Sequence, residues 1–234
     1  METLPKRLAA VASLIPPGKT VADIGTDHGY LPVFLINSGR SSKVIASDIH
    51  RGPFERARSY IRSQGLEESI DIRLGRGLQV LQPYEVQVAV IAGLGGETMV
   101  EIFAEGREII ASLEGLALNP VTHQSGVRRW LTGNGWRLED ENLVEDQGRL
   151  YQIIFACPGK QLESAGWSDL EYEIGPLILR KRHPLLKEYL GRKLKKYERV
   201  ANNLQFSKST QTVERLKKLT ADIENVEEWY RSLT

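Results

Sequence analysis

Apolar residues recur along this chain with two different periods, which predict an alternation of strands and helices. Short apolar runs predict seven strands, at 20–24, 43–48, 69–74, 86–92, 115–118, 136–144 and 149–157. Helical spacing predicts helices at 3–14, 29–38, 51–65, 97–110 and around 127–131. Five strand–helix units followed by a hairpin across Asp146-Gln147-Gly148 indicate an α/β fold. We expect a Rossmann-like, mostly parallel seven-stranded sheet with one antiparallel strand at its edge.

The pattern changes in the last third of the chain. Residues 158–180 are typical of a linker that packs back on the preceding domain, and beyond them apolar residues recur every three or four positions. These residues form two rows: Leu186, Leu190, Leu194, Tyr197, Ala201 and Leu204, then Val213, Leu216, Ile223, Val226 and Tyr230. With Ser207-Lys208-Ser209-Thr210 turning the chain between them, the rows predict a coiled-coil-like, antiparallel helical hairpin. We therefore expect two domains, 1–160 and 161–234.

Composition narrows the class of protein. The chain is 41% hydrophobic and 26% charged, which favours a globular protein. A single cysteine, Cys157, excludes an internal disulfide framework, and the four scattered histidines have no zinc-binding spacing, so no metal site is expected. No stretch has the length and apolarity of a membrane helix. These features predict a soluble, cytoplasmic protein that does not bind membranes, and nothing in them indicates an obligate protein partner.

Charge is distributed unevenly. The chain carries a net charge of +1, but residues 1–155 hold 16 Lys and Arg against 19 Asp and Glu, whereas residues 180–218 hold 13 against 3. Such a basic block is most often the solvated face of a helix. It is also the electrostatic footprint of nucleic-acid binding, so both interpretations stand at this point.

The stretch Val21 to Pro32 carries the first chemical signal. Apolar residues lead into Asp23, and Gly25-Thr26-Asp27-His28-Gly29 then forms a turn into a helix, the geometry that brings backbone N–H groups to a cofactor. A dinucleotide site normally has a further glycine where Asp27 stands. Acids here repel a pyrophosphate and suit a cationic ligand, so S-adenosylmethionine, with its ammonium and sulfonium groups, fits better than a dinucleotide.

Two further strand ends support a nucleoside cofactor. Asp48, followed by Ile49, ends the second strand at the distance expected of a carboxylate that binds ribose hydroxyls. The fourth strand ends in Ala92-Gly93-Leu94-Gly95-Gly96, which is either a tight turn or a place for close backbone approach by a ligand. The predicted cofactor-binding residues are Asp23, Gly25, Asp27, His28, Asp48, Ile49, Arg76, Gly77, Ala92, Gly93 and Gly95.

Four motifs in order give the chain a family resemblance. With the segments 23–32, Gly52-Pro53-Phe54, 92–96 and Glu173-Ile174-Gly175-Pro176, the chain resembles the TrmK family of bacterial tRNA adenine(22)-N1-methyltransferases from about residue 3 to beyond Pro184, helical tail included. The resemblance implies a class I methyltransferase core, S-adenosylmethionine as donor, tRNA as substrate and a coiled-coil-like C-terminal domain that contacts tRNA.

The chain departs from this family at two places. The family typically has an Asp in the loop that is Gly75-Arg76-Gly77 here, where an acid would accept a hydrogen bond from the cofactor's adenine amino group. A guanidinium only donates hydrogen bonds, so Arg76 cannot replace that acid. The family also often has Gln-Pro-Asn after the fifth strand, where this chain has Asn119-Pro120-Val121.

Methylation of adenine N1 needs no base to create the nucleophile, because N1 attacks with its own lone pair. Catalysis then requires positioning and hydrogen-bond acceptors where positive charge develops. Asp27 and Asn119 are the predicted catalytic residues. The structural alternatives are a helix N-cap for Asp27 and a turn residue for Asn119. His28 is more often a structural residue than an acid or base.

Adenine N1 lies on the Watson–Crick edge, so the protein must hold an exposed or flipped adenine through the surrounding RNA. The predicted RNA-binding residues are Arg51, Arg56, Arg58, Arg62, Arg182, Arg192, Lys193, Lys195 and Lys196. The sequence alone also leaves open a methyltransferase acting on another nucleobase, a protein or a small molecule, and a non-catalytic Rossmann-like nucleotide-binding protein.

Overall fold

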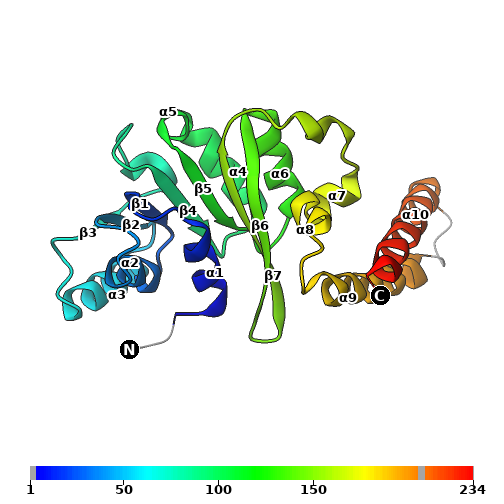
Figure 1. Ribbon diagram of the computed structural model, residues 1–234, viewed down its shortest axis with the longest axis horizontal. Helices are drawn as coiled ribbons and strands as arrows, with labels where there is room; N and C mark the ends of the chain where they lie inside the picture. Colours follow the sequence, from blue (N-terminus) through cyan, green and yellow to red (C-terminus); the bar gives the residue numbers. More distant parts are fainter. Residues whose placement is uncertain (1–3, 205–208, 234) are drawn as a thin grey trace. The chain divides into compact units, whose positions relative to one another are not determined.

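The computed structural model describes residues 4–204 and 209–233, and these divide into two compact units, Met1–Leu177 and Ile178–Thr234. Seven strands of the described residues form one sheet in the order β3-β2-β1-β4-β5-β7-β6 (Figure 1). The strands are β1 Val21–Ile24, β2 Val44–Asp48, β3 Ile70–Leu74, β4 Val88–Ala92, β5 Gly115–Asn119, β6 Trp136–Asp146 and β7 Arg149–Pro158. The seven predicted strands and the Rossmann-like layout are confirmed.

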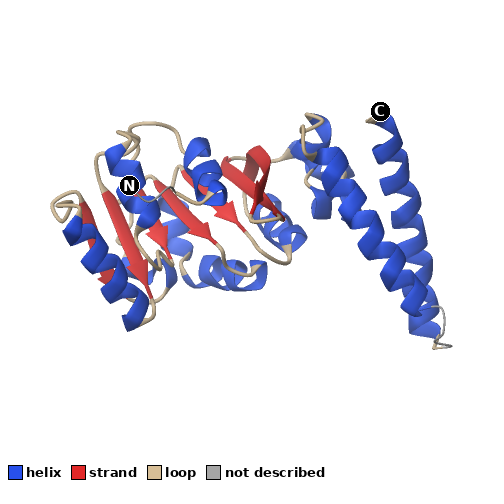
Figure 2. Cartoon of the chain, turned by 90° about the horizontal axis from the view of Figure 1, so that it is seen from below, coloured by secondary structure: helices blue, strands red, loops and turns tan. Residues whose placement is uncertain are grey.

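The helices of the first unit cover both faces of this sheet (Figure 2). On one face lie α1 Lys6–Leu14, α2 Tyr30–Asn37 and α3 Arg51–Ser63, and on the other lie η1 Gly77–Val80, α4 Gly96–Glu105, α5 Arg107–Ser112 and α6 Gln124–Gly133. Successive strand residues point to opposite faces of the sheet: Val88 packs against the α1–α3 layer, and Ala89 packs against the α4–α6 layer. This two-sided burial explains why the central strands are continuous apolar runs.

The antiparallel strand is not at the edge of the sheet, as predicted, but one position inside it. β7 pairs antiparallel with both β5 and β6, which leaves β6 as the edge strand. The two strands are joined by Gln147 and Gly148, both with positive φ, and a two-residue loop requires its strands to be neighbours. After β5, the chain therefore forms β6 one strand position further out, and β7 then takes the position between β5 and β6.

Two further predictions differ from the structure. The predicted helix 97–110 is two helices, because the chain breaks at Gly106, where an added Cβ would lie 2.7 Å from the Leu78 side chain. The predicted linker contains η2 Leu162–Gly166 and α7 Asp169–Ile174, and α7 begins with a capping box between Ser168 and Glu171. The predicted domain boundary at 160 thus precedes the end of the first compact unit, at Leu177.

A buried polar cluster joins this extension to the sheet. Arg128 of α6 is fully buried, and its guanidinium donates to Glu141 of β6 at 2.5 Å, to Gln152 of β7 at 2.6 Å and to the Tyr172 carbonyl at 2.8 Å. The second Glu141 carboxylate oxygen accepts from the Leu177 backbone N–H at 2.8 Å. One guanidinium therefore links α6, the β6–β7 hairpin and α7.

The helix α8 Pro176–Arg180 spans the boundary between the units, and the second unit continues with α9 Leu186–Leu204 and α10 Thr210–Ser232. The start of α9 contacts the end of α10, since Lys187 Nζ lies 5.4 Å from the Tyr230 ring centroid, so the two helices are antiparallel, as predicted. Of the predicted rows, Leu186, Leu190 and Tyr197 on α9 and Val226 on α10 are buried. In the predicted turn, Ser209 caps α10, and residues 207 and 208 lie outside the described residues.

We expect Arg128→Met to lower the free energy of unfolding by about 3–5 kcal/mol, because it leaves Glu141 buried with an uncompensated charge. The neighbouring residue provides a matched control: Arg129 pairs with Asp169 at the surface, and Arg129→Met should cost under about 1 kcal/mol. Urea denaturation of both variants measures the difference. Equal destabilisation would mean that the buried cluster contributes no more than a surface pair.

Candidate functional site

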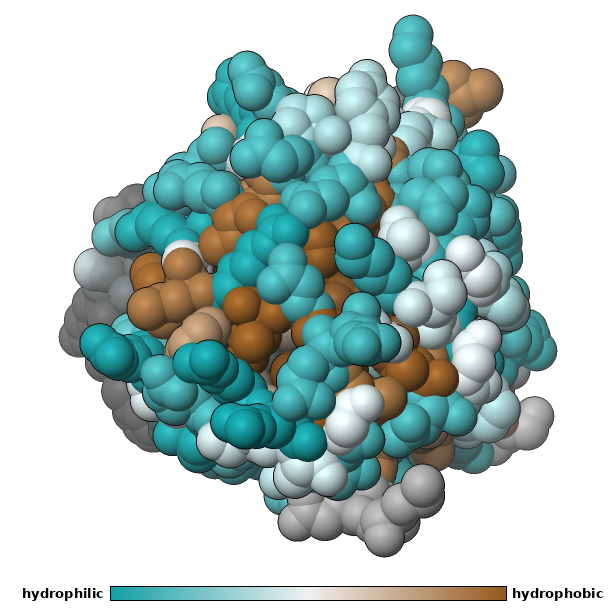
Figure 3. Space-filling view, turned by 90° about the vertical axis from the view of Figure 1, so that its left-hand side faces the viewer, coloured by the Kyte–Doolittle hydropathy of each residue, from teal (hydrophilic) through white to brown (hydrophobic). Residues whose placement is uncertain are grey.

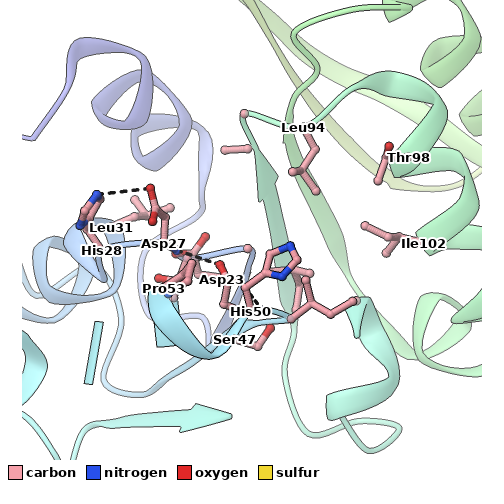
Figure 4. Close-up of a pocket in the computed structure, with 18 of the residues that line it drawn as sticks. Asp23, Asp27, His28, Leu31, Ser47, His50, Pro53, Leu94, Thr98 and Ile102 are labelled. Atoms are coloured by element: carbon pink, nitrogen blue, oxygen red, sulfur yellow. Dashed lines mark hydrogen bonds and ion pairs between the residues drawn. The ribbon is translucent and has the colours of Figure 1, made fainter. Parts of the chain in front are cut away.

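A cleft of about 830 Å³ opens at the carboxyl ends of β1, β2 and β4. In Figure 4, Asp23, Ser47 and His50 come from the β1 and β2 side of the cleft, and Leu94, Thr98 and Ile102 come from the β4–α4 side. All the predicted cofactor-binding residues except Gly95 line this cleft: Asp23, Gly25, Asp27, His28, Asp48, Ile49, Arg76, Gly77, Ala92 and Gly93. The parallel strands explain this convergence, because their carboxyl ends meet at one edge of the sheet.

Two carboxylates form the floor of the cleft. Asp23 at the end of β1 and Asp48 at the end of β2 are 4% and 8% exposed. Burial raises the pKa of the Asp23 carboxyl to about 6, and the negative charge of Asp48 adds to this effect. Asp48 is held by two backbone amides, that of His50 at 2.9 Å and that of Asp27 at 3.3 Å, which fix its orientation. A cationic group would relieve the repulsion between the two acids.

Two buried hydroxyls of the cleft, those of Thr26 and Ser47, have no hydrogen-bond partner among the described residues. Ser47 is 1% exposed, lines the cleft, and its Oγ makes no hydrogen bond. An orphaned buried polar atom costs free energy until a ligand or water satisfies it. A ligand that carries hydroxyls and a cationic amine, as S-adenosylmethionine does, fits the set formed by Ser47, Asp23 and Asp48.

Asp27 is placed at the mouth of the cleft and does not cap a helix. The N-cap of α2 is Gly29, and the Asp27 carboxylate instead accepts from Arg56 at 2.8 Å and lies 3.4 Å from His28 Nε2. The capping alternative for Asp27 is therefore wrong. His28 stacks on Tyr30 with ring centroids 5.2 Å apart. Asp27 is half-exposed and has positive φ, so its carboxylate is accessible from the cleft.

Asn119 and Gly95 do not line the cleft. Asn119 is fully buried: its side-chain N–H donates to the Gln152 carbonyl at 3.0 Å, its backbone carbonyl accepts from the Gly93 N–H, and its side-chain oxygen has no hydrogen-bond partner among the described residues. The catalytic role predicted for Asn119 thus has no support in the geometry. The Gly93–Gly96 turn is tight because of protein contacts: a Cβ on Gly96 would lie 2.6 Å from the His123 carbonyl oxygen. Gly95 is the N-cap of α4, which accounts for its place outside the cleft.

The Arg76 guanidinium forms a bidentate ion pair with Glu105 of α4, with hydrogen bonds of 2.7 and 2.8 Å. Glu105 raises the pKa of Arg76, and Arg76 in turn lowers the pKa of Glu105.

Beside Arg76, the cleft is lined by Gly77, Ile102 and the half-exposed Ile49. Figure 3 views the molecule from the β3 side and shows apolar residues gathered inside a hydrophilic rim.

Sequence reasoning missed two groups of lining residues. Pro5, Arg7 and Leu8 come from the start of α1, and Thr98, Glu101 and Ile102 come from α4. The helical periodicity of both segments is visible in the sequence, but which end of each helix reaches the cleft depends on tertiary packing.

The predicted RNA-binding residues lie in two places. Arg51, Arg56, Arg58 and Arg62 belong to α3 of the first unit, whereas Arg192, Lys193, Lys195 and Lys196 belong to α9 of the second, with Arg182 between α8 and α9. Arg56 is engaged by Asp27, and Arg192 pairs with Glu188. Lys195 and Lys196 are exposed.

Comparison with known proteins decides between the alternatives. The model of the family TrmK, tRNA (adenine(22)-N(1))-methyltransferase, matches residues 21–228. The chain belongs to the TrmK family. The tRNA (adenine(22)-N(1))-methyltransferase of Bacillus subtilis is 30% identical over 230 residues, which cover 96% of each chain. The resemblance found in the sequence is therefore confirmed.

Solved structures agree with this assignment. The crystal structure of B. subtilis TrmK has a TM-score of 0.88 to this chain at 30% identity and covers 98% of this chain and 100% of its own. That of Streptococcus pneumoniae Sp1610 in complex with S-adenosyl-L-methionine has a TM-score of 0.82 at 29% identity, covering 97% and 100%. This TrmK-family chain is an S-adenosylmethionine-dependent tRNA (adenine22-N1)-methyltransferase.

The part of the chain that the structure describes lacks two kinds of feature. No helix in them has both the length and the apolar character needed to cross a membrane. Within the same residues, no three His, Cys, Asp or Glu side chains are grouped so that they could hold a metal ion.

We expect Asp23→Asn to stabilise the free protein at neutral pH. The carboxyl pKa is 3.8 ordinarily and about 6 in the fold, so between these values the folded state binds the extra proton and stability falls as pH rises. Above pH 6 the buried charge costs on the order of 3 kcal/mol, which the amide avoids. Urea denaturation at pH 7.5, pH 4.5 and pH 3 measures this: the variant should gain most at pH 7.5, about a third as much at pH 4.5, and nothing at pH 3, below both pKa values. An identical pH dependence of the two proteins would refute the raised pKa.

Proposed function

We propose that the cleft binds S-adenosylmethionine across the ends of four strands, in an orientation that presents the methyl group to N1 of adenine 22 of tRNA. The observation that carries this proposal is the pair of buried carboxylates, Asp23 and Asp48, that face one cleft beside the partnerless Ser47 hydroxyl. These acids match two of the parts of the cofactor that donate hydrogen bonds, its ammonium group and its ribose hydroxyls.

The order of the strands sets the orientation of the cofactor. Asp48 at the end of β2 would accept from the ribose hydroxyls, since its carboxylate is already oriented by two backbone amides. Asp23 at the end of β1 would bind the ammonium. The adenine then lies toward β3 and η1, against Ile49, Gly77 and Ile102, and the methionine end lies toward β4. Apolar contact suits the flat adenine ring.

Bound S-adenosylmethionine supplies a methyl group on a sulfonium, which adenine N1 attacks as the thioether leaves. The adenine ring gains the positive charge that the sulfur loses. The protein's task is therefore to hold N1 in line with the methyl and to place a carboxylate near the growing charge. Asp27 is an accessible carboxylate at the cleft mouth, and its two neighbours, Arg56 and His28, keep it in place.

If Asp27 stabilises this charge, Asp27→Asn should lower kcat roughly 10- to 100-fold while changing S-adenosylmethionine affinity much less. Single-turnover methylation of tRNA and calorimetry with the cofactor separate the two effects. Arg56→Gln is the matched control, because it removes the ion pair but keeps the Asp27 charge. A normal kcat for Asp27→Asn, or an equal loss in the control, would assign Asp27 to holding Arg56 instead.

The adenine base cannot react while paired, so the protein must hold the folded RNA around it. We assign this role to the exposed cations of α3 and of the helical tail. On α3, Arg51 and Arg62 are 85% and 83% exposed, and on α9 Lys195 and Lys196 lie on the polar side of the helix, away from buried Tyr197. Contacts of this kind go to phosphates and position the RNA without identifying its sequence.

Replacing Lys195 and Lys196 with Gln should weaken tRNA binding and reduce its salt dependence. Each lost phosphate contact should lower the slope of log K against log salt by about 0.7–0.9. Filter binding between 50 and 300 mM salt measures the slope. The control Arg107→Gln with Lys160→Gln removes the same charge from exposed positions of the first unit, and it should leave the slope unchanged. Parallel slopes for all three proteins would place the RNA contacts outside α9.

A further inference from the structure

The β6–β7 hairpin extends beyond the strand that it flanks. β7 pairs with β5 as far as Leu118, and β5 ends one residue later, at Asn119. The last four pairs of the hairpin, residues 143–146 with residues 149–152, lie beyond that point. At about 3.4 Å for each residue, they extend roughly 14 Å past the carboxyl end of β5. Figure 1 shows the loop of this hairpin beyond the ends of the other strands.

The loop end of the hairpin lies beside the mouth of the cleft. A carboxylate oxygen of Asp146, the last residue of β6, lies 3.4 Å from the Arg7 backbone nitrogen and 4.0 Å from Arg7 Nε. Arg7 lines the cleft together with Pro5 and Leu8, so the start of α1 separates the hairpin loop from the cleft interior. A ligand too large for the cleft would therefore meet the loop at its entrance.

Arg149, the first residue of β7, shares a face of the sheet with α3. Successive strand residues alternate between faces, so Arg149 is on the face of Tyr151 and Ile153, which pack with the α1–α3 layer. α3 begins at Arg51, next to His50 of the cleft lining. The strand that precedes it, β2, is four positions from β7 in the sheet, roughly 19 Å at about 4.8 Å for each strand. The hairpin loop and the start of α3 thus flank the cleft on opposite sides.

The acids of the loop have partners within the protein, whereas its arginine has none. Glu145 accepts from the Gly148 N–H at 2.6 Å and pairs with Lys6 at 3.8 Å, and Asp146 is buried against the start of α1. Arg149 is exposed, and within the described residues its side chain makes no hydrogen bond or ion pair. Lys6 is 73% exposed, and 3.8 Å is too long for a hydrogen bond. Both cations can therefore bind an external anion.

We propose that the loop of the β6–β7 hairpin, through Arg149 and Lys6, binds the tRNA backbone on the side of the cleft opposite α3. The inference rests on the function proposed above, in which the protein holds the RNA around an adenine presented to the cleft. Phosphates held on both sides keep the segment that carries this adenine across the cleft mouth. A guanidinium suits this contact because its planar fork of donors matches a phosphate.

An acidic protein is the other partner that two exposed cations could bind. RNA is favoured by the position of the loop, because a protein seated there would cover the entrance through which the adenine must pass. It is also favoured by the arginines of α3, which are on the same face of the sheet across the cleft. The experiment below separates the two partners, since only RNA binding requires a change in tRNA affinity.

The test measures tRNA binding and cofactor binding separately in Arg149→Gln. Loss of one phosphate contact should weaken tRNA binding roughly 3- to 10-fold and lower the slope of log K against log salt by about 0.7–0.9. Arg149→Lys should keep the slope, because it keeps the charge. Calorimetry should show unchanged S-adenosylmethionine affinity in both variants, because Arg149 does not line the cleft. Adding Lys6→Gln to Arg149→Gln should lower the slope further.

Arg137→Gln is the matched control. Arg137 belongs to the same hairpin and its side chain is 49% exposed. It lies opposite Cys157, near the amino end of β5 and away from the cleft. The control removes the same charge as Arg149→Gln, and it should leave both tRNA affinity and the salt slope unchanged.

Three results would overturn the proposal. An unchanged tRNA affinity and salt slope in Arg149→Gln would show that the loop contacts no phosphate and would leave its cations to a protein partner. An equal fall of the slope in Arg137→Gln would reduce the effect to net charge. A loss of S-adenosylmethionine affinity as large as the loss of tRNA affinity would make Arg149 a determinant of cleft shape, acting through α1.

Arg51→Gln separates this inference from the proposed function on which it depends. Arg51 is 85% exposed at the start of α3 and is one of the phosphate contacts proposed above. If Arg51→Gln lowers the slope and Arg149→Gln does not, only the assignment of the hairpin loop fails. If neither variant lowers it, the RNA does not bind across the cleft mouth, and the proposed contacts on both sides fail together.

Discussion

Burial of the central strands on both faces determines where this protein can bind a ligand. Val21 and Ala22 of β1, like Val88 and Ala89 of β4, are essentially inaccessible and pack alternately under the two helical layers. A polar side chain in the body of such a strand would lose its water without gaining a partner, at a cost of several kcal/mol. Polar groups are therefore confined to the strand ends, and the parallel register gathers those ends into one cleft.

Acids gathered at one edge make the free cleft electrostatically unfavourable. Asp23 is buried next to Asp48, and its raised pKa expresses the cost of keeping that carboxylate ionised. A ligand with an ammonium and a sulfonium lowers this cost on binding, so part of its affinity comes from relief of repulsion already present in the fold.

Sequence patterns predicted the features that depend on local chemistry. Each strand is a short apolar run, and Asp23 and Asp48 follow such runs directly, so their meeting in one cleft follows from parallel topology. Features that depend on distant contacts were missed. The burial of Arg128 depends on Glu141 and Gln152, 13 and 24 residues away, and nothing in an amphipathic helix marks one arginine as internal. The same holds for Arg7, whose neighbour Gly93 is 86 residues further along the chain, and for Asn119, whose side-chain N–H donates to the Gln152 carbonyl of β7.

Arg76 shows how a departure from the family pattern is accommodated. An acid at this position would accept from the adenine amino group, whereas a guanidinium pointing inward would present only donors to it. The bidentate ion pair with Glu105 removes that conflict, because it holds the guanidinium toward α4. Arg76 in turn serves as the counter-ion of Glu105. What remains for the adenine is the aliphatic surface of Ile49 and Ile102 beside Gly77. In the proposed orientation, recognition at this end would rest on apolar contact with the ring, and the polar contacts that fix the cofactor would come from Asp48 and Asp23.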